Sequence, residues 1–240
     1  LITNYQLLSN APITPTSLLD LVALGLIADV ALLKGEARSL VQRGLQVLRN
    51  TGRIGLRTMA ELSGTSLESL TEESVGFTFA PRLNALGRLG DANPAVDLLL
   101  SHDPVRARVI ATQIEGLNAQ RRLLTNQVYE AAETQLRESP ELLSEPAIIL
   151  FNENWPGGVV GIVANKLVER YRKPTILLNQ SENGILRGSA RSVEGLHITE
   201  AIATQKDLLL GFGGHPMAAG LALEAWRLPE FRKGLGKAIE

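Results

Sequence analysis

Cysteine is absent from the 240 residues, which excludes disulfides, thiolate nucleophiles and cysteine-ligated metal sites. Histidine is scarce, with three residues, and aromatic residues make up only 4% of the chain. No apolar run reaches the roughly 18 residues that a membrane-spanning helix requires. The chemistry of the chain must therefore use carboxylates, hydroxyls, Lys, Arg or one of the three His.

The chain also lacks an excess of either charge, because 24 Lys and Arg face 25 Asp and Glu, for a net charge of −1. This balance argues against a uniformly basic nucleic-acid-binding protein. The cations are nevertheless skewed, with 18 Arg to 6 Lys, and the anions likewise, with 19 Glu to 6 Asp. Arg is the residue that binds phosphate with two parallel hydrogen bonds, so a few well-placed Arg could build a phosphate site.

Three regions differ in pattern, and 240 residues are enough for one large domain or two small ones. Residues 1–100 read as short helices separated by glycine, with Gly52 and Gly64 at expected helix ends. Residues 101–145 hold one long helix that starts at Asp103-Pro104 and runs to about Pro140. At about 1.5 Å per residue this helix would measure roughly 50 Å, which favours a connector between two bodies over an ordinary core helix.

Residues 146–240 alternate strand and helix patterns, which predicts an α/β domain with a helix-covered mixed sheet. The fold class is therefore α/β, with a mostly helical first part. The expected strands are 147–151, 175–178, 186–192 and 219–223, and the expected helices are 159–171, 197–204 and 228–239.

Asp29 is conspicuous because the stretch from Leu21 to Leu33 is otherwise uncharged. A buried carboxylate is costly unless it is paired or binds a cation. Asp29 is therefore either a metal ligand or a residue that marks the exposed end of a buried helix.

The segment Ala80–Asp91 places two Arg, one Asn and two Gly in what reads as an irregular stretch. Such a segment could form a phosphate clamp. Equally, Arg82 could form an ion pair with Asp91, Glu72 or Glu73.

Two glycine- or arginine-containing segments follow in the last region. Trp155-Pro156-Gly157-Gly158 joins a strand to a helix, where backbone N–H groups can approach an anion, although the spacing matches no dinucleotide or P-loop motif. On the strand 186–192, alternation sends Arg187, Ser189 and Arg191 to one face. The segment is either a phosphate site or a solvated strand face.

Gly211–Gly220 is the strongest local signal, with four Gly around His215 and a Pro directly after it. This density of glycine predicts a loop in which the backbone and the imidazole closely approach a ligand. His102 and His197 lack such surroundings and read as surface or capping residues.

Taken together, these segments resemble the RecJ family of the DHH phosphoesterase superfamily, whose members are 5′→3′ exonucleases specific for single-stranded DNA. The matching stretches occur in the order and spacing of the family across nearly the whole chain. They are Leu19–Val30, Gly35–Arg38 with Leu45, Ala80–Asp91, Trp155–Ala164, Arg187–Ser192 and Phe212–Gly220.

The resemblance implies an architecture and a set of site residues. Residues 1–100 would be the C-terminal part of the DHH catalytic domain, 101–145 the interdomain connector and 146–240 the DHH-associated domain. Asp29 would be a catalytic ligand of a Mn²⁺ or Mg²⁺ pair, and His215 would be a catalytic residue that contacts the substrate phosphates. The implied substrate-binding residues are Arg82, Asn84, Arg88, Arg187, Ser189, Arg191, Gly213, Gly214 and His215.

The chain departs from the family pattern in two places. Pro156 stands where the family commonly has a His, so we assign it no role. The family's paired-Asp motif, its second-motif Asp and its Asp-His-His triplet are absent, so Asp29 would be the only direct metal ligand that the resemblance implies. Because the chain also begins at Leu1, without Met or a signal peptide, we expect a piece of a longer protein that has no nuclease activity by itself.

The implied activity is two-metal hydrolysis of single-stranded DNA from the 5′ end, releasing 5′-mononucleotides during repair and recombination. Alternatives are a phosphodiesterase for oligonucleotides or cyclic dinucleotides, or a non-catalytic module that binds nucleic acid. The resemblance implies a cytoplasmic monomer whose partners are single-stranded DNA, a single-strand DNA-binding protein and a RecQ-type helicase, without membrane contact.

Overall fold

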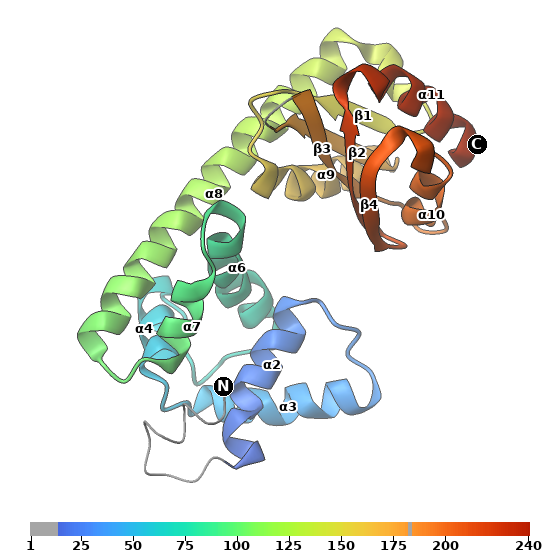
Figure 1. Ribbon diagram of the computed structural model, residues 1–240. Helices are drawn as coiled ribbons and strands as arrows, with labels where there is room; N and C mark the ends of the chain where they lie inside the picture. The colour runs from blue at the N-terminus through green and yellow to red at the C-terminus, as the bar shows by residue number, and fades with distance from the viewer. Residues whose placement is uncertain (1–13, 182–183) are drawn as a thin grey trace. The chain divides into compact units, whose positions relative to one another are not determined.

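The long helix predicted between Asp103 and Pro140 is present as α8 (Pro104–Glu138) in the computed structural model, which describes residues 14–181 and 184–240 (Figure 1). The carboxylate of Asp103 caps it, accepting hydrogen bonds from the backbone N–H groups of Val105 and Arg106 at 2.8 and 3.3 Å. The chain divides into two compact units after Gln120, inside α8. Across the described ranges, no helix combines the length and hydropathy that crossing a membrane requires.

The first unit is helical over its described residues, as the glycine-punctuated pattern predicts. α2 and α3 approach closely, since a Cβ on Gly44 would collide with the carbonyl oxygen of Leu19. Leu45, Leu56, Phe79 and other apolar side chains fill the core between the helices. The elements before α8 are η1 (Pro15–Leu18), α2 (Leu19–Ala28), α3 (Gly35–Arg49), α4 (Ile54–Ser63), α5 (Glu72–Ser74), η2 (Val75–Phe79), α6 (Ala80–Leu89) and α7 (Asn93–Leu100).

Three local predictions in this unit differ in outcome. Gly64 ends α4 in the left-handed conformation with φ 66°, as predicted, but α3 ends with Asn50 rather than Gly52 as its C-cap. The segment 80–91 is wrongly predicted as irregular, because residues 80–89 form α6. Pro81 lies just after the π-helical turn η2, which continues into α6 without a break.

The second unit contains the end of α8 and a five-stranded mixed sheet in the order β1-β2-β3-β5-β4. β1 and β2 are parallel and joined by α9, and the other pairs are antiparallel. The elements are η3 (Pro140–Leu143), β1 (Ile148–Phe151), α9 (Gly157–Tyr171), β2 (Thr175–Gln180), β3 (Ile185–Arg191), α10 (Ile198–Ala203), η5 (Lys206–Leu208), β4 (Leu209–His215), β5 (Ala218–Glu224), η6 (Ala225–Arg227) and α11 (Leu228–Ile239).

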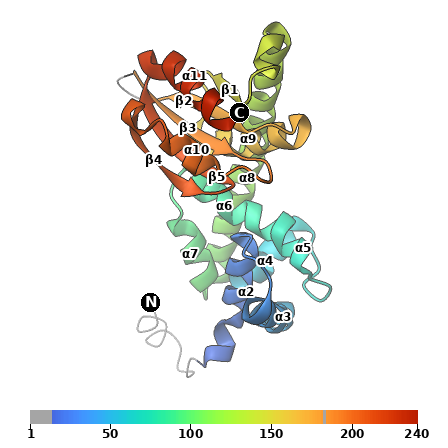
Figure 2. The same cartoon turned by 90° about the vertical axis from the view of Figure 1, so that its right-hand side faces the viewer.

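Helices pack on both faces of this sheet, as Figures 1 and 2 show. Leu177 on one face packs with α9 and the end of α8, whereas Ile176 and Leu178 on the other face pack with α10 and α11. On the face that carries Leu177, helix α9 packs over strands β2 and β3. On the same face farther along, Gly211, Gly213 and Gly220 of β4 and β5 are exposed. This part of the sheet, which we call the open face, also includes Ala218, Ala222 and His215.

The glycine-rich segment is wrongly predicted as a loop, because Leu209–His215 forms β4 and Pro216-Met217 makes the turn into β5. Glycine lacks the bulky side chain that favours strands, so the composition hid the element. Pairing with the recognised strand β5 imposes the extended backbone.

Candidate functional site

Arg82 is largely buried and already bound on three sides. Its Nε and Nη2 donate to the two carboxylate oxygens of Glu115 at 2.6 and 3.1 Å, and its Nη1 donates to the carbonyl oxygen of Thr78 at 2.8 Å. Only 7% of the residue is exposed. The ion-pair partner is therefore Glu115 on α8, and not Asp91, Glu72 or Glu73. Arg82 ties α6 to α8, and its direct contact with substrate stays a prediction.

Asn84 and Arg88, the other predicted residues of this segment, are exposed on α6. Their separation of four residues places both on one helix face. Partial desolvation lowers the pKa of the Arg88 guanidinium below its usual value. Just beyond the helix, the backbone N–H and the side-chain amide of Asn93 each donate to Asp91 at 3.0 Å, which lowers the pKa of that carboxyl.

Asp29 is exposed at the C-cap of α2, where its backbone N–H donates to the carbonyl of Gly25. The exposed helix end is thus what the structure shows, and metal ligation stays a prediction. Within the described ranges, no group of three or more His, Cys, Asp or Glu could hold a metal ion. Asp29 could supply one oxygen ligand, but these residues by themselves do not fit a metal pair.

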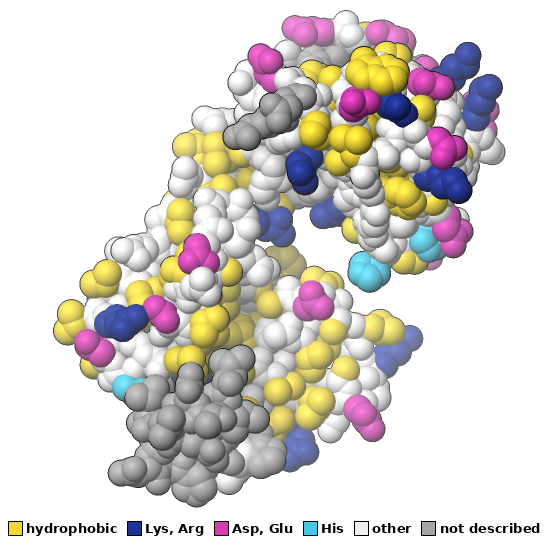
Figure 3. Space-filling view, in the orientation of Figure 1, with side chains coloured by type: hydrophobic (Ala, Val, Ile, Leu, Met, Phe, Trp, Pro, Cys, Tyr) yellow, Lys and Arg dark blue, Asp and Glu magenta, His cyan; other side chains and the backbone are white. Residues whose placement is uncertain are grey.

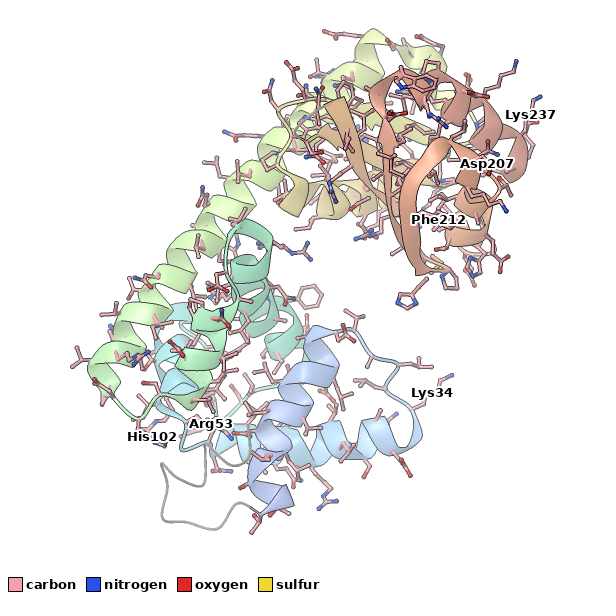
Figure 4. The ribbon with its side chains drawn as sticks, in the orientation of Figure 1. Lys34, Arg53, His102, Asp207, Phe212 and Lys237 are labelled. Carbon is pink, nitrogen blue, oxygen red and sulfur yellow. The ribbon has the colours of Figure 1, made fainter. Side chains whose placement is uncertain are left out.

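The buried carboxylate of this unit is Asp20, which the sequence analysis did not single out. It is 2% exposed and accepts from Nε of Arg53 at 2.6 Å and from the hydroxyl of Thr51 at 3.3 Å. These residues line a cavity of about 340 Å³ together with His102 (Figure 4 labels Arg53 and His102). Because Arg53 is 33 residues away in the sequence, no local pattern announces this pair.

In the second unit, Ser189 and Arg191 lie against helix α9. A Cβ built on Gly161 would be 2.8 Å from Nη2 of Arg191 and 3.2 Å from Oγ of Ser189. Any larger residue at position 161 would therefore displace these two side chains. Helix α9 begins at Gly157, and its first N–H groups are suited to an anion. Gly161, the fifth residue of α9, therefore lets a hydroxyl and a guanidinium lie close to the N-terminal half of this helix.

The strand register extends this group into rows across one face. Directly paired residues of antiparallel strands point to the same side, so Arg191, Ala218 and His215 form one row. The next rows are Ser189–Gly220–Gly213 and Arg187–Ala222–Gly211. The prediction that Arg187, Ser189 and Arg191 share a face is thereby confirmed.

Two residues in this region need separate mention. Gly214 has φ 157°, and a Cβ there would collide with the carbonyl of Ala218, so packing explains this glycine. Asn179 was missed by the sequence analysis: it pairs with Arg187, and its Nδ2 lies 3.5 Å from the Cβ position of Gly157. The sequence feature that could have indicated Asn179 is its position as a polar residue directly after the apolar run 175–178.

Two other predictions concern Trp155 and His197. Trp155 is 5% exposed and packs in the core beneath α9, and its indole N–H has no hydrogen-bond partner within the described residues. His197 caps α10, with Nδ1 accepting from the N–H of Glu200 at 3.2 Å, so its prediction as a surface or capping residue is confirmed. On the face of this unit that Figure 3 shows, charged side chains of both signs are interspersed.

Residues 144–240 match the DHHA1 domain family. Over 227 residues, the chain is 43% identical to the single-stranded-DNA-specific exonuclease RecJ of Bacillus subtilis, covering 94% of this chain and 29% of that protein. The enzyme of the same name from Escherichia coli is 36% identical, with 92% of this chain and 40% of that protein covered. The chain belongs to the RecJ family.

Solved structures agree with this assignment. RecJ from Thermus thermophilus in complex with Mn²⁺ has a TM-score of 0.83 at 35% identity, covering 94% of this chain and 33% of that one. The complex of that RecJ with Mg²⁺ has a TM-score of 0.82 at 34% identity, covering 94% of this chain and 34% of that one. The chain thus spans less than half the length of these RecJ proteins.

Proposed function

We propose that this chain supplies the strand-gripping part of a RecJ-type exonuclease that degrades single-stranded DNA from its 5′ end. The supporting observation is the convergence of Ser189 and Arg191 on Gly161, close to the start of α9. A terminal phosphate carries more negative charge than an internal one, so a pocket of this kind selects a 5′-phosphorylated end.

The remaining residues have supporting roles in this proposal. His215 lies in the same row as Arg191 and is exposed, so its imidazole can donate a hydrogen bond to a neighbouring phosphate. Gly213, in the row of Ser189, leaves space for the DNA to approach the sheet, whereas packing against Ala218 accounts for Gly214 and its contact with substrate stays a prediction. In the first unit, Asn84 and Arg88 offer a further exposed pair of phosphate-binding groups on α6.

The reaction proposed for the whole enzyme is hydrolysis of the bond between the terminal nucleotide and the rest of the strand. Water adds to the phosphorus, the P–O3′ bond breaks and a 5′-mononucleotide leaves. A pair of Mn²⁺ or Mg²⁺ ions would activate the water and stabilise the leaving oxygen. Asp29 is one proposed ligand, and because the described residues offer no complete ligand set, we assign no metal-dependent step to this chain alone.

The substitution Arg191→Ala tests this function. We expect the wild-type chain to bind a 5′-phosphorylated oligonucleotide about 10-fold more tightly than its 5′-hydroxyl counterpart, since charge-assisted hydrogen bonds contribute about 1.5–3 kcal/mol. Arg191→Ala should remove this preference, as measured by fluorescence anisotropy. An unchanged preference contradicts the assignment.

Arg137→Ala is the matched control, because Arg137 is exposed on α8 and, among the residues that the structure describes, its guanidinium donates only to Thr134. This variant should keep the 5′-phosphate preference. Oligonucleotide length separates the alternative function: dinucleotides that bind as tightly as strands of about 12 nucleotides would favour a phosphodiesterase for short substrates.

A further inference from the structure

A hollow lies on the open face of the sheet, at the end away from His215. Its volume is about 560 Å³, within the range of about 300–1,000 Å³ that is usual for ligand pockets. Arg187, Ala222 and Gly211 form one row of its floor, and Gly213 and Gly220 belong to the next. Phe212, Leu221 and Gly188 also line the hollow, but they form the alternate row, whose side chains point to the other face of the sheet. On the open face the floor is therefore backbone and one methyl group, beside a single guanidinium.

The glycines of this floor are not required by the fold. A Cβ on Gly211 or Gly213 would meet no atom within 4 Å, and one on Gly220 would touch only the carbonyl of Gly188 at 4.0 Å. None of the three has a positive φ. Glycine within a strand lowers its stability. Since neither packing nor backbone conformation explains these three residues, the open space above them is the feature that they preserve.

The rim combines apolar side chains with an available cation. Ile185 and Leu210 line the hollow, and Leu210, at an irregularity in the register of β4, is 57% exposed. Arg187 is exposed and has no hydrogen bond or ion pair with any residue that the structure describes. Glu224, which pairs with Ile185 in the sheet, lies 3.3 Å from Nε of Arg227.

We propose that this hollow binds a nucleobase of the DNA strand, with an adjoining phosphate on Arg187. A flat, uncharged ring fits a floor without side chains and an aliphatic rim. Only a ligand that also carries a negative charge would bind the guanidinium of Arg187. A simple inorganic anion would leave the apolar surface unused. The inference rests on the proposed function and identifies a contact inside the strand rather than at its end.

The position of the hollow defines which part of the strand it binds. Arg187 and Arg191 are four residues apart on one strand face, which corresponds to about 13 Å. Ser189 and Arg191 would hold the terminal phosphate at one end of this distance, and the hollow lies at the other. The bound base therefore belongs to an internal nucleotide, and the terminal nucleotide stays near His215.

Abasic substitution tests the proposal directly. Single-stranded oligonucleotides with a 5′-phosphate and one abasic nucleotide, moved stepwise from the 5′ end, are titrated into the 240-residue chain by fluorescence anisotropy. We expect a loss of affinity of about 5-fold at one internal position and little change at the others. Gly211→Val fills the floor, so it should weaken binding of the intact strand to a similar extent and abolish the penalty at that position.

Thermal unfolding and a second glycine serve as controls. Gly211→Val should keep or raise the melting temperature, because valine favours strands and the space is open. Gly211→Ala should show a smaller effect of the same kind, and it replaces the valine variant if that one fails to fold. Gly116→Ala adds the same methyl group at an exposed position of α8, where a Cβ would meet no atom within 4 Å. This variant should leave binding unchanged.

Two results would overturn the inference while leaving the proposed function intact. One is wild-type binding that is equally tight wherever the abasic nucleotide lies. The other is a folded Gly211→Val chain that keeps both its affinity and its position-dependent penalty. If the wild-type chain binds no single-stranded DNA, or ignores the 5′-phosphate, the proposed function fails and the inference fails with it.

Discussion

Two arginines, Arg82 and Arg187, differ in what their guanidinium groups already bind, although each belongs to a segment that the sequence marks as a candidate phosphate site. In the first unit, Arg82 is buried and forms two hydrogen bonds to Glu115 and one to Thr78. In the second unit, Arg187 is exposed and has no partner within residues 14–181 and 184–240. Arg82 therefore contributes mainly to the fold, whereas Arg187 contributes mainly a surface charge.

Because of this difference, we expect substitution of Arg82 to change mainly the stability of the fold and substitution of Arg187 to change mainly the binding of DNA. Removing a buried arginine leaves a carboxylate and a carbonyl without their donor, which destabilises the folded state. Removing an exposed, unpaired arginine leaves nothing unsatisfied. The same substitution in the two segments should consequently change different measured quantities.

The largest expected effect is on stability, from Arg82→Ala. We expect a loss of about 2–3 kcal/mol in the free energy of unfolding, less than for a fully buried pair because the Glu115 side chain is 38% exposed. Urea denaturation measures this loss. Glu115→Gln, which keeps an acceptor for one of the two hydrogen bonds, should lose about 1 kcal/mol. A loss below about 1 kcal/mol for Arg82→Ala would contradict the structural role.

An intermediate effect is expected on binding, from Arg187→Ala. The free energy of unfolding should change by no more than about 0.5 kcal/mol, since the side chain is exposed and unpaired. Affinity for single-stranded DNA should fall about 3- to 10-fold, and the slope of log K against log salt concentration should decrease by about 0.7, the value for one lost phosphate contact on a single strand. An unchanged slope would show that Arg187 does not contact phosphate.

The smallest effect is expected from Asp29→Asn. A carboxylate at a helix C-terminus is unfavourable, so this change should leave stability unchanged or raise it by up to about 0.5 kcal/mol. Chemical denaturation at low salt provides the measurement. A loss above about 1 kcal/mol would mean that Asp29 has a structural partner. A neutral result makes this variant suitable for testing metal ligation, because any change in Mn²⁺ binding would then not reflect unfolding.

Elements with local signals could be predicted from the sequence. The cap at Asp103 with Pro104, followed by few helix breakers, predicted α8, and the alternation of Arg187, Ser189 and Arg191 predicted one face of β3. Both signals depend on neighbours within a few residues.

Features that depend on distant partners could not be predicted. Arg82 and Arg53 each bind a carboxylate 33 residues away, so sequence proximity suggested the wrong partners for Arg82 and gave no signal for Asp20. The strand β4 likewise could not be predicted, because its glycine-rich segment is extended only through pairing with β5. The open face depends on the same pairing, so the sequence alone could not predict it either.

The irregularity at Leu210 has a consequence for how the protein behaves at high concentration. β4 is the last strand in the order, so its outer backbone groups have no neighbouring strand among the described residues. An uncovered edge of this kind, with no Lys to repel a second chain, invites pairing between copies. The shift in register between Leu209 and Gly211 interrupts the regular spacing of its N–H and C=O groups. We therefore expect this irregularity to weaken edge-to-edge pairing between copies of the chain.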